Sequence, residues 1–289
     1  MKASWDKAVK ADKCLRIKKG KSPSSVYEFG DFFLRPVLIM SAKGNLTIKN
    51  EFKESDKNGV YRAIYSRRDI RGQFHGDTIS EEVLSRILHA AHHAPSVGFM
   101  QPWNFILIKN FKIRRAVHEA FKHANSEATL MFSEDKREKY QKFKLEGILE
   151  SPLNICITCD RNRFGPTVIG RTANPDMDMF SSVCAVHNLW LAARAEGLGV
   201  GWVSIIHNRE LSEILCLPEN IVPVAYLCVG YVTHFPPKPE LESAGWLPRL
   251  SLEKLIFCDQ WKTDCQTNWP KLYEEVQSYR NSYEELYIK

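Results

Sequence analysis

The sequence predicts an α+β fold in which helices wrap a sheet, and three observations support this class. Short apolar runs of strand length, among them NFILIK, LNICITC and VAYLCVGYV, are bounded by polar or turn-forming residues. Longer stretches between them carry apolar residues at every third or fourth position, which is the period of a helix. The two kinds of segment alternate without the even strand–helix–strand rhythm of a doubly wound sheet.

The first half of the chain is predicted to hold helices followed by a strand. KNGVYRAIYSRR has helical spacing, and a second helix opens at TISEE, where Thr78 or Ser80 provides the N-cap. That helix stops at Pro95, and the run from Asn104 to Lys109 is expected to be a strand. Residues 112–150 are highly charged and follow a helical pattern throughout.

The second half centres on a long helix, from Asp178 to Glu196, that is apolar nearly all round. Such a helix must be covered on every side, by the core or by another subunit. Buried strands are expected at LNICITC, directly after the long helix and at Val224 to Val232, and the last twenty residues are expected to be helical. GLGVG, Gly197 to Gly201, has the wrong order for a dinucleotide-binding motif, because here a helix precedes the glycines and a strand follows them. We therefore expect a helix C-cap followed by close backbone packing.

The charge distribution divides the chain into three predicted parts. The net charge is +6, but residues 1–50 alone have seven more basic than acidic side chains. We expect a loosely ordered basic extension over residues 1–50, a folded domain over 51–260 and a helical C-terminal extension over 261–289. The folded part has no basic surplus, so nucleic-acid binding is not expected. No apolar run approaches the roughly 20 residues that a membrane span needs, and the leader does not resemble a secretory signal.

Cysteines and histidines offer weak candidates for metal ligands. Cys156 and Cys159 have CxxC spacing, but residues three apart in a strand point to opposite faces, and no second CxxC follows. His89, His92 and His93 include a pair with helical spacing, yet no glutamate accompanies them as a base. We interpret these histidines as surface or capping residues and expect no metal site. Most cysteines are expected to be reduced core residues of a cytoplasmic protein.

SRRDIRGQF follows the first predicted helix and has two interpretations. Arg67, Arg68 and Arg71 are able to give bidentate hydrogen bonds to a phosphate, or they form a solvated charged turn. Asp69, flanked by arginines, is expected to act as an ion-pair partner. The stretch by itself does not decide between the two.

Three motifs that follow one another in a fixed order are more informative about function: SRRDIRGQF, then AAHHAPSVGFMQPWNFILI, then NPDMDMFSSVCAVHNLWLAARAEGLGVGWVSI. This combination resembles the FMN-dependent nitroreductase superfamily and, within it, the 5,6-dimethylbenzimidazole synthases of BluB type. The resemblance spans about residues 60–261. Nitroreductases commonly have RRS where this chain has Asp69, and often Asn at the position of Phe99, whereas Asp69, SVGFMQPW and Ser204 match the synthases. The resemblance implies a mixed sheet flanked by helices and a homodimer with FMN at its interface.

The resemblance also implies roles for individual residues. An arginine cluster is expected to hold the phosphate and ribityl end of FMN, with help from the C-terminal segment: Arg67, Arg68, Arg71 and Arg249. The flavin ring is expected to lie between two groups: Ser96, Val97, Gly98 and Gln101 on one side, and Trp202, Val203 and Ser204 on the other. Asp69 and Ser204 are the expected catalytic residues, with Asp69 as proton shuttle. Phe99, Met100 and Trp103 are expected to wall out water.

The implied reaction is the oxygen-dependent fragmentation of reduced FMN to 5,6-dimethylbenzimidazole, the lower ligand of cobalamin, and erythrose 4-phosphate. FMN would then be a substrate, O2 the co-substrate, and NAD(P)H an indirect source of electrons through an external flavin reductase. Two alternatives remain open: an NAD(P)H-dependent FMN nitroreductase or flavin reductase of the same fold, and a non-catalytic flavin-binding protein.

Overall fold

The computed structural model describes residues 51–287 and two short strands, β1 (Ile39–Met40) and β2 (Leu46–Thr47), which pair antiparallel. The chain divides into two units, Met1–Glu51 and Phe52–Lys289. The predicted basic extension falls in the first unit and lies almost wholly outside the described residues. All further elements belong to the second unit.

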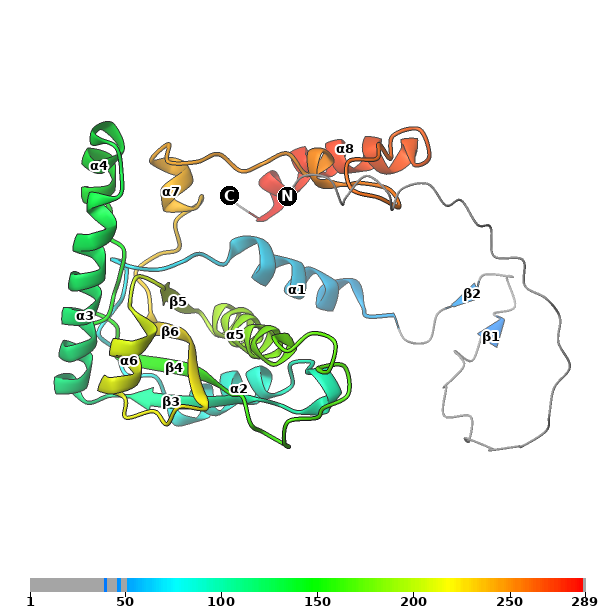
Figure 1. The fold of residues 1–289 in the computed structure, drawn as a ribbon. Coiled ribbons are helices and arrows are strands. Elements are labelled where there is room, and N and C mark those ends of the chain that lie inside the picture. The colour runs from blue at the N-terminus through cyan, green and yellow to red at the C-terminus, as the bar shows by residue number, and fades with distance from the viewer. Residues whose placement is uncertain (1–38, 41–45, 48–50, 288–289) are drawn as a thin grey trace, which may run out of the picture. The chain divides into compact units, whose positions relative to one another are not determined.

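A four-stranded sheet forms the centre of the second unit (Figure 1). Its strands are β3 (Trp103–Ile108), β4 (Leu153–Asp160), β6 (Ile221–Tyr231) and β5 (Leu198–Val203), in that spatial order, and each neighbouring pair is antiparallel. A parallel bridge between Asp69 and Val200 adds to the edge at β5. The predicted α+β class, with helices around a sheet, is confirmed.

Helices cover both faces of this sheet. One face packs against α2 (Glu81–His92) and α5 (Met177–Ala195), and the other against α3 (Phe111–Leu130) and α6 (Asn208–Ile214). Along β4, Ile155 and Ile157 face the first pair of helices while Cys156 faces the second. This alternation is the period of two that the buried strand requires, and it separates the core into two clusters.

The remaining elements of the unit are α1 (Glu54–Ser66), η1 (Val97–Phe99), α4 (Glu134–Gln141), α7 (Glu240–Ser243), η2 (Leu252–Leu255) and α8 (Pro270–Tyr287). Ser80, not Thr78, caps α2, because its hydroxyl oxygen accepts a hydrogen bond from the Val83 amide at 3.3 Å. The helix expected over the last twenty residues is confirmed as far as Tyr287. Among the described helices, none combines the length and the apolar character that a bilayer crossing requires.

The helical pattern predicted over residues 112–150 is wrong after Gln141, where the chain forms turns. A distant arginine binds the end of this turn segment. The buried guanidinium of Arg114 on α3 donates to the carbonyl oxygens of Ile148, at 2.7 and 3.0 Å, and of Ser151. This tertiary contact holds the carbonyl end of the segment in place, and nothing in the local charge periodicity indicates it.

The cysteines agree in part with the sequence prediction. Cys156 lies in the core cluster beneath α3 and α6, whereas Cys159 lies against Ser182 of α5, so the two point to opposite faces as predicted. Burial raises the pKa of the Cys156 thiol to about 12, which makes it chemically inert. Cys258 and Cys265, however, form a disulfide.

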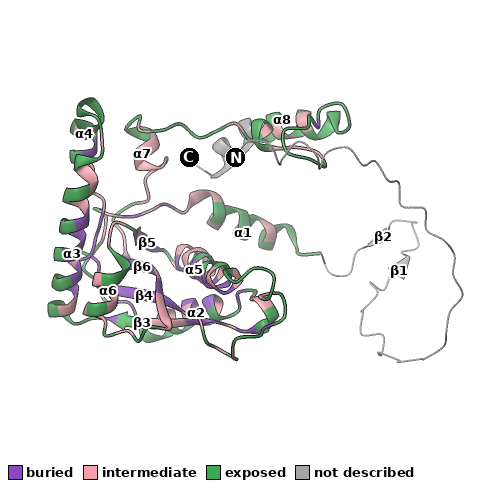
Figure 2. Ribbon diagram, in the orientation of Figure 1, coloured by how far each residue is buried: buried purple, intermediate pink, exposed green. Residues whose placement is uncertain are grey.

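The long helix α5 is apolar but not covered on every side. Ala185, Val186 and Leu189 are fully or almost fully buried, while Phe180 and Val183 are 54% and 41% exposed. On α1, which packs beside α5, no residue is buried (Figure 2). One apolar side of the long helix is therefore left open within the single chain.

The segment after α1 approaches the β5 edge so closely that only glycine fits there. The Ile70 amide donates to the Val200 carbonyl at 3.0 Å, and the Ile70 side chain is fully buried. A Cβ on Gly201 would lie 2.0 Å from the Ile70 carbonyl oxygen, and one on Gly199 would lie 2.8 Å from Ile70 Cγ1. Gly197, with φ 78°, ends α5. The prediction that GLGVG provides a C-cap and close backbone packing is thus confirmed.

Gly201→Ala should destabilise the protein, because the added methyl group meets backbone that cannot move without breaking the Asp69–Val200 bridge. We expect a loss of at least about 2 kcal/mol in the free energy of unfolding, measured by urea denaturation. Gly76→Ala is the matched control, since a Cβ there has no neighbour within 4 Å. Equal stability of the two variants would contradict the close approach.

Candidate functional site

Asp69 occupies the centre of the candidate site, at the edge of the sheet beside β5. Its Oδ1 accepts a hydrogen bond from the Trp202 amide at 2.9 Å. Its Oδ2 accepts two from the Arg71 guanidinium, at 2.7 Å from Nη2 and 3.1 Å from Nε. The carboxylate is one-third exposed, so three donors hold it in place while part of it faces solvent.

Arg67 and Arg68 form a positively charged cluster with Arg249 next to Asp69. Burial lowers the pKa of Arg67, and the charge of Arg249 lowers it further, although Asp69 opposes both effects. Burial also lowers the pKa of Arg68, and repulsion from Arg67, Arg249 and Arg194 adds to it. A bound anion would relieve this repulsion.

The Arg68 side chain is largely fixed by backbone carbonyls. Its Nη1 donates to Tyr65 and Arg67, at 2.8 and 2.7 Å, and its Nη2 donates to Pro237. Its buried Nε has no hydrogen-bond partner in the described part of the chain. The donor set of this cluster therefore fits a phosphate, because it combines mutual repulsion with an unused N–H group.

The three arginines of SRRDIR do not act alike. The Arg71 guanidinium binds Asp69, and its Nη1 also donates to the Lys144 carbonyl at 3.4 Å. Arg67 instead lies over the Trp190 ring, 5.2 Å from its centroid. The expectation that Asp69 serves as an ion-pair partner is met through Arg71.

Trp202, Val203 and Ser204 form the end of β5 and the residue after it. The Trp202 amide is bound to Asp69, the Val203 side chain is buried in the core, and Ser204 is exposed just beyond the strand. Ser204 therefore lies two residues from the amide that Asp69 holds. The structure brings together the arginines, Asp69 and this strand end.

The turn from Ser96 to Gln101 has an unusual backbone. Gly98, Phe99 and Gln101 all have positive φ, at 51°, 54° and 45°. The Ser96 hydroxyl oxygen accepts from the Gln101 amide at 3.1 Å, and the Val97 amide donates to Ser181 Oγ on α5 at 3.1 Å. A Cβ on Gly98 would lie 2.5 Å from Val168 Cγ1. Non-glycine residues with positive φ cost energy, and such backbone occurs often at binding sites.

The predicted apolar wall is wrong for two of its three residues. Met100 is completely buried and Trp103 is 3% exposed, so neither side chain has surface to offer a ligand. Trp103 Nε1 instead donates to His92 at 3.1 Å. Phe99 is 79% exposed and is the one member that faces outward.

The two groups of predicted site residues contact opposite ends of α5. The turn is bound to Ser181, whereas Trp190 Nε1 donates to the Arg68 carbonyl at 3.2 Å. Nine residues separate these two anchors, which is about 14 Å along a helix axis. The arginine cluster and the Ser96–Gln101 turn of one chain are therefore held apart.

Sequence reasoning missed Trp190 and Arg194, which fix the arginine segment onto α5. Arg194 Nε donates to the Ser66 carbonyl at 3.3 Å, and its guanidinium lies 3.9 Å from the centroid of the Phe235 ring. Their i, i+4 spacing on a helix that is otherwise apolar was the available signal. The histidine prediction holds: His93 caps α2, and its Nδ1 lies 2.7 Å from the His89 carbonyl oxygen.

Comparisons with known proteins show the family of this chain. The model of the nitroreductase family matches residues 64–231. A 5,6-dimethylbenzimidazole synthase of Rhodospirillum rubrum is 38% identical over 198 residues, which cover 68% of this chain and 93% of that protein. A protein of the same description from Rhodobacter capsulatus is 33% identical over 202 residues, covering 70% and 97%.

The fold is shared with solved structures as well. The crystal structure of oxidized iodotyrosine deiodinase, bound to FMN and 3-iodo-L-tyrosine, superimposes with a TM-score of 0.56. It is 20% identical and covers 70% of this chain and all of its own. Sequence motifs, family model and fold thus lead to one conclusion: this chain belongs to the nitroreductase family of flavin-dependent oxidoreductases.

Proposed function

We propose that this protein is a 5,6-dimethylbenzimidazole synthase, which fragments reduced FMN with O2 to 5,6-dimethylbenzimidazole and erythrose 4-phosphate. Two relatives of that description match almost their whole length to this chain. The observation that carries the proposal is Asp69, held by Arg71 and the Trp202 amide at a strand edge beside an arginine cluster. A carboxylate fixed there is suited to proton transfer rather than to phosphate binding.

The FMN phosphate and ribityl end would be bound by Arg67, Arg68 and Arg249. The mutual repulsion of these guanidiniums is the support for this assignment. Because Arg71 is bound to Asp69, it would hold that carboxylate and contact only the edge of the ribityl chain. The ring would lie against the backbone of Trp202, Val203 and Ser204.

A second copy of the chain would supply the residues on the other side of the flavin ring: Ser96, Val97, Gly98 and Gln101. Their separation from the arginine cluster along α5 supports a site built by two subunits. The open side of α5 supports it too, because Phe180, Val183 and His187 have the i, i+3, i+7 spacing of one exposed face. Val60, Tyr61 and Ile64 on the neighbouring α1 are likewise exposed. A homodimer would cover both.

Reduced FMN would supply both the electrons and the carbon skeleton of the product. Asp69, whose side chain is one-third exposed, would accept and return protons, while Arg71 fixes its orientation. Ser204, with its hydroxyl beyond the end of β5, would position O2 or the ribityl carbon that is cut. Phe99 would exclude water. The electrons would come from NAD(P)H through an external flavin reductase in the cytoplasm.

Asp69→Asn should lower product formation by about 100-fold or more, the usual contribution of a positioned proton-transfer group. The assay supplies chemically reduced FMN and O2 and measures 5,6-dimethylbenzimidazole by chromatography. Asp77→Asn, which changes an exposed aspartate paired with His75, is the control and should keep full activity. Full-rate product formation by Asp69→Asn would rule out the proton role.

The same assay on the unmodified protein separates the alternatives. Product from reduced FMN supports the synthase. Oxidation of NAD(P)H without that product would indicate a nitroreductase or flavin reductase, and intact FMN with no turnover would indicate a flavin-binding protein.

Arg67→Ala should weaken FMN binding about tenfold or more, because a hydrogen bond to a charged group contributes about 1.5–3 kcal/mol. Quenching of flavin fluorescence measures the dissociation constant. Arg115→Ala removes an exposed guanidinium that lies over Phe111 and provides the control. Unchanged affinity in Arg67→Ala would place the phosphate elsewhere.

Val183→Asp should convert a dimer to monomers, because it puts a charge in the middle of the open face of α5. Sedimentation velocity at micromolar concentration measures the change. Leu130→Asp on α3, where the side chain is 72% exposed, is the matched control and should remain dimeric. If both variants sediment as the unmodified protein does, α5 is not the interface.

A further inference from the structure

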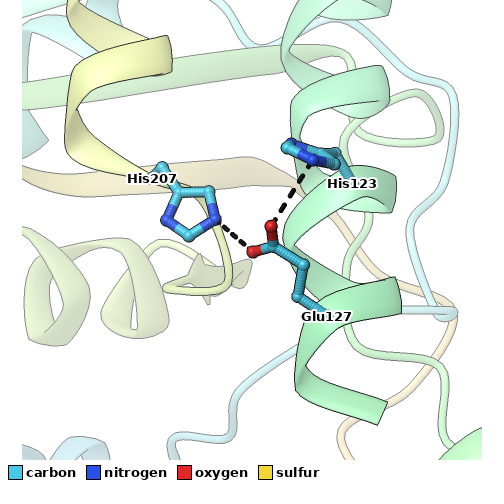
Figure 3. Close-up of side chains that lie close together, drawn as sticks. All are labelled: His123, Glu127 and His207. Atoms are coloured by element: carbon cyan, nitrogen blue, oxygen red, sulfur yellow. Dashed lines mark hydrogen bonds and ion pairs between the residues drawn. The ribbon is translucent and has the colours of Figure 1, made fainter. Parts of the chain in front are cut away.

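Two histidines and a glutamate meet on the surface where α3 lies beside α6 (Figure 3). His123 and Glu127 are one turn apart on α3, so both project from the same side of that helix. His207 is the N-cap residue of α6 and points toward them. The flavin site uses none of these three residues.

The Glu127 carboxylate lies between the two imidazole rings and directs one oxygen to each. Its Oε2 is 2.6 Å from His207 Nε2, and its Oε1 is 3.5 Å from His123 Nε2. One ligand atom from each residue lies within 4.8 Å of the others. Zn²⁺ binds imidazole nitrogen and carboxylate oxygen at about 2.0–2.2 Å. Small rotations of these exposed side chains would bring the three atoms to that distance from one ion.

Glu210 adds an independent feature of metal sites. Its Oε1 lies 2.8 Å from His123 Nδ1, the ring nitrogen that faces away from Glu127. Histidines that bind a metal through one nitrogen almost always donate the other N–H to a carboxylate or carbonyl group, which fixes the ring and its tautomer. If Nδ1 carries the proton that Glu210 accepts, the Nε2 lone pair faces the Glu127 carboxylate. Two hydrogen-bond acceptors, His123 Nε2 and the Glu127 carboxylate, then face one another. A cation between them would stabilise this arrangement.

We propose that His123, Glu127 and His207 bind a divalent transition-metal ion, of which Zn²⁺ is the best fit, with Glu210 orienting His123. Two imidazoles disfavour Mg²⁺ and Ca²⁺, which prefer oxygen ligands alone. The charges of Glu127 and Glu210 together balance the two positive charges of the ion. Because the site is exposed, water would complete the coordination.

A bound ion would join α3 to the start of α6. The segment that leaves β5 after Ser204 reaches His207 three residues later. The ion would therefore fix the path of the chain between the end of β5 and α6. Because it binds only the folded arrangement, it would also stabilise the protein against unfolding.

The test is calorimetric titration of ZnCl2 into full-length, tag-free protein that has been treated with a chelator. We expect one binding site for each chain and a rise of several degrees in the melting temperature with saturating Zn²⁺. His207→Gln and Glu127→Gln should each weaken binding at least about tenfold, and Glu210→Gln about tenfold. His75→Gln, which alters another exposed histidine paired with a carboxylate, should bind as the unmodified protein does.

Other zinc ligands would give a different pattern. Cys216 is an exposed free cysteine, so Cys216→Ser is included and should retain full binding. All four residues of the proposed site lie on the surface or are partly exposed. An unfolding curve of each variant, recorded without metal, checks that the variant is folded. The proposal is overturned if the protein binds no Zn²⁺ at millimolar concentration, if His207→Gln and Glu127→Gln bind normally, or if Cys216→Ser abolishes binding.

Discussion

The close approach of residues 67–71 to β5 is the constraint on which the site depends. It requires Gly199 and Gly201, because a side chain at either position would meet Ile70. Because residues 67–71 lie this close to β5, Asp69 reaches the Trp202 amide. For the same reason the arginines before Asp69 pack against the C-terminal end of α5. The backbone contact between Ile70 and β5, which leaves no room for a methyl group, thus positions both the Asp69 carboxylate and the arginine cluster.

The long helix α5 organises everything else around that contact. Near its N-terminal end, Ser181 holds the turn with positive φ angles, and toward its C-terminal end Trp190 and Arg194 hold the arginine segment. Its inner side fills the core against the sheet, while Phe180 and Val183 remain open. The proposed two-subunit flavin site follows from these facts, because one helix both separates the two groups and presents a surface for a second copy.

Much of the fold could be predicted from sequence, because buried strands leave a local signal. LNICITC is apolar on both sides of β4 and stands out as a continuous run, and GLGVG reveals its role by the order of helix, glycines and strand. The turns after Gln141 have no signal in the local charge pattern, and the contact of Arg114 with the Ile148 and Leu149 carbonyl groups joins residues more than thirty positions apart. The pairing of Asp69 with Arg71 rather than with its other neighbours, and the meeting of His123 with His207, likewise depend on tertiary contacts that spacing does not encode.

A crystal structure of the full chain with FMN would show which residues of each subunit hold the flavin. We expect the phosphate against Arg67 and Arg68, the ring beside the Trp202 and Ser204 backbone with Asp69 still bound to Arg71, and Ser96 to Gln101 contributed by the second chain. A flavin held wholly by one chain, or a phosphate remote from the arginine cluster, would contradict it.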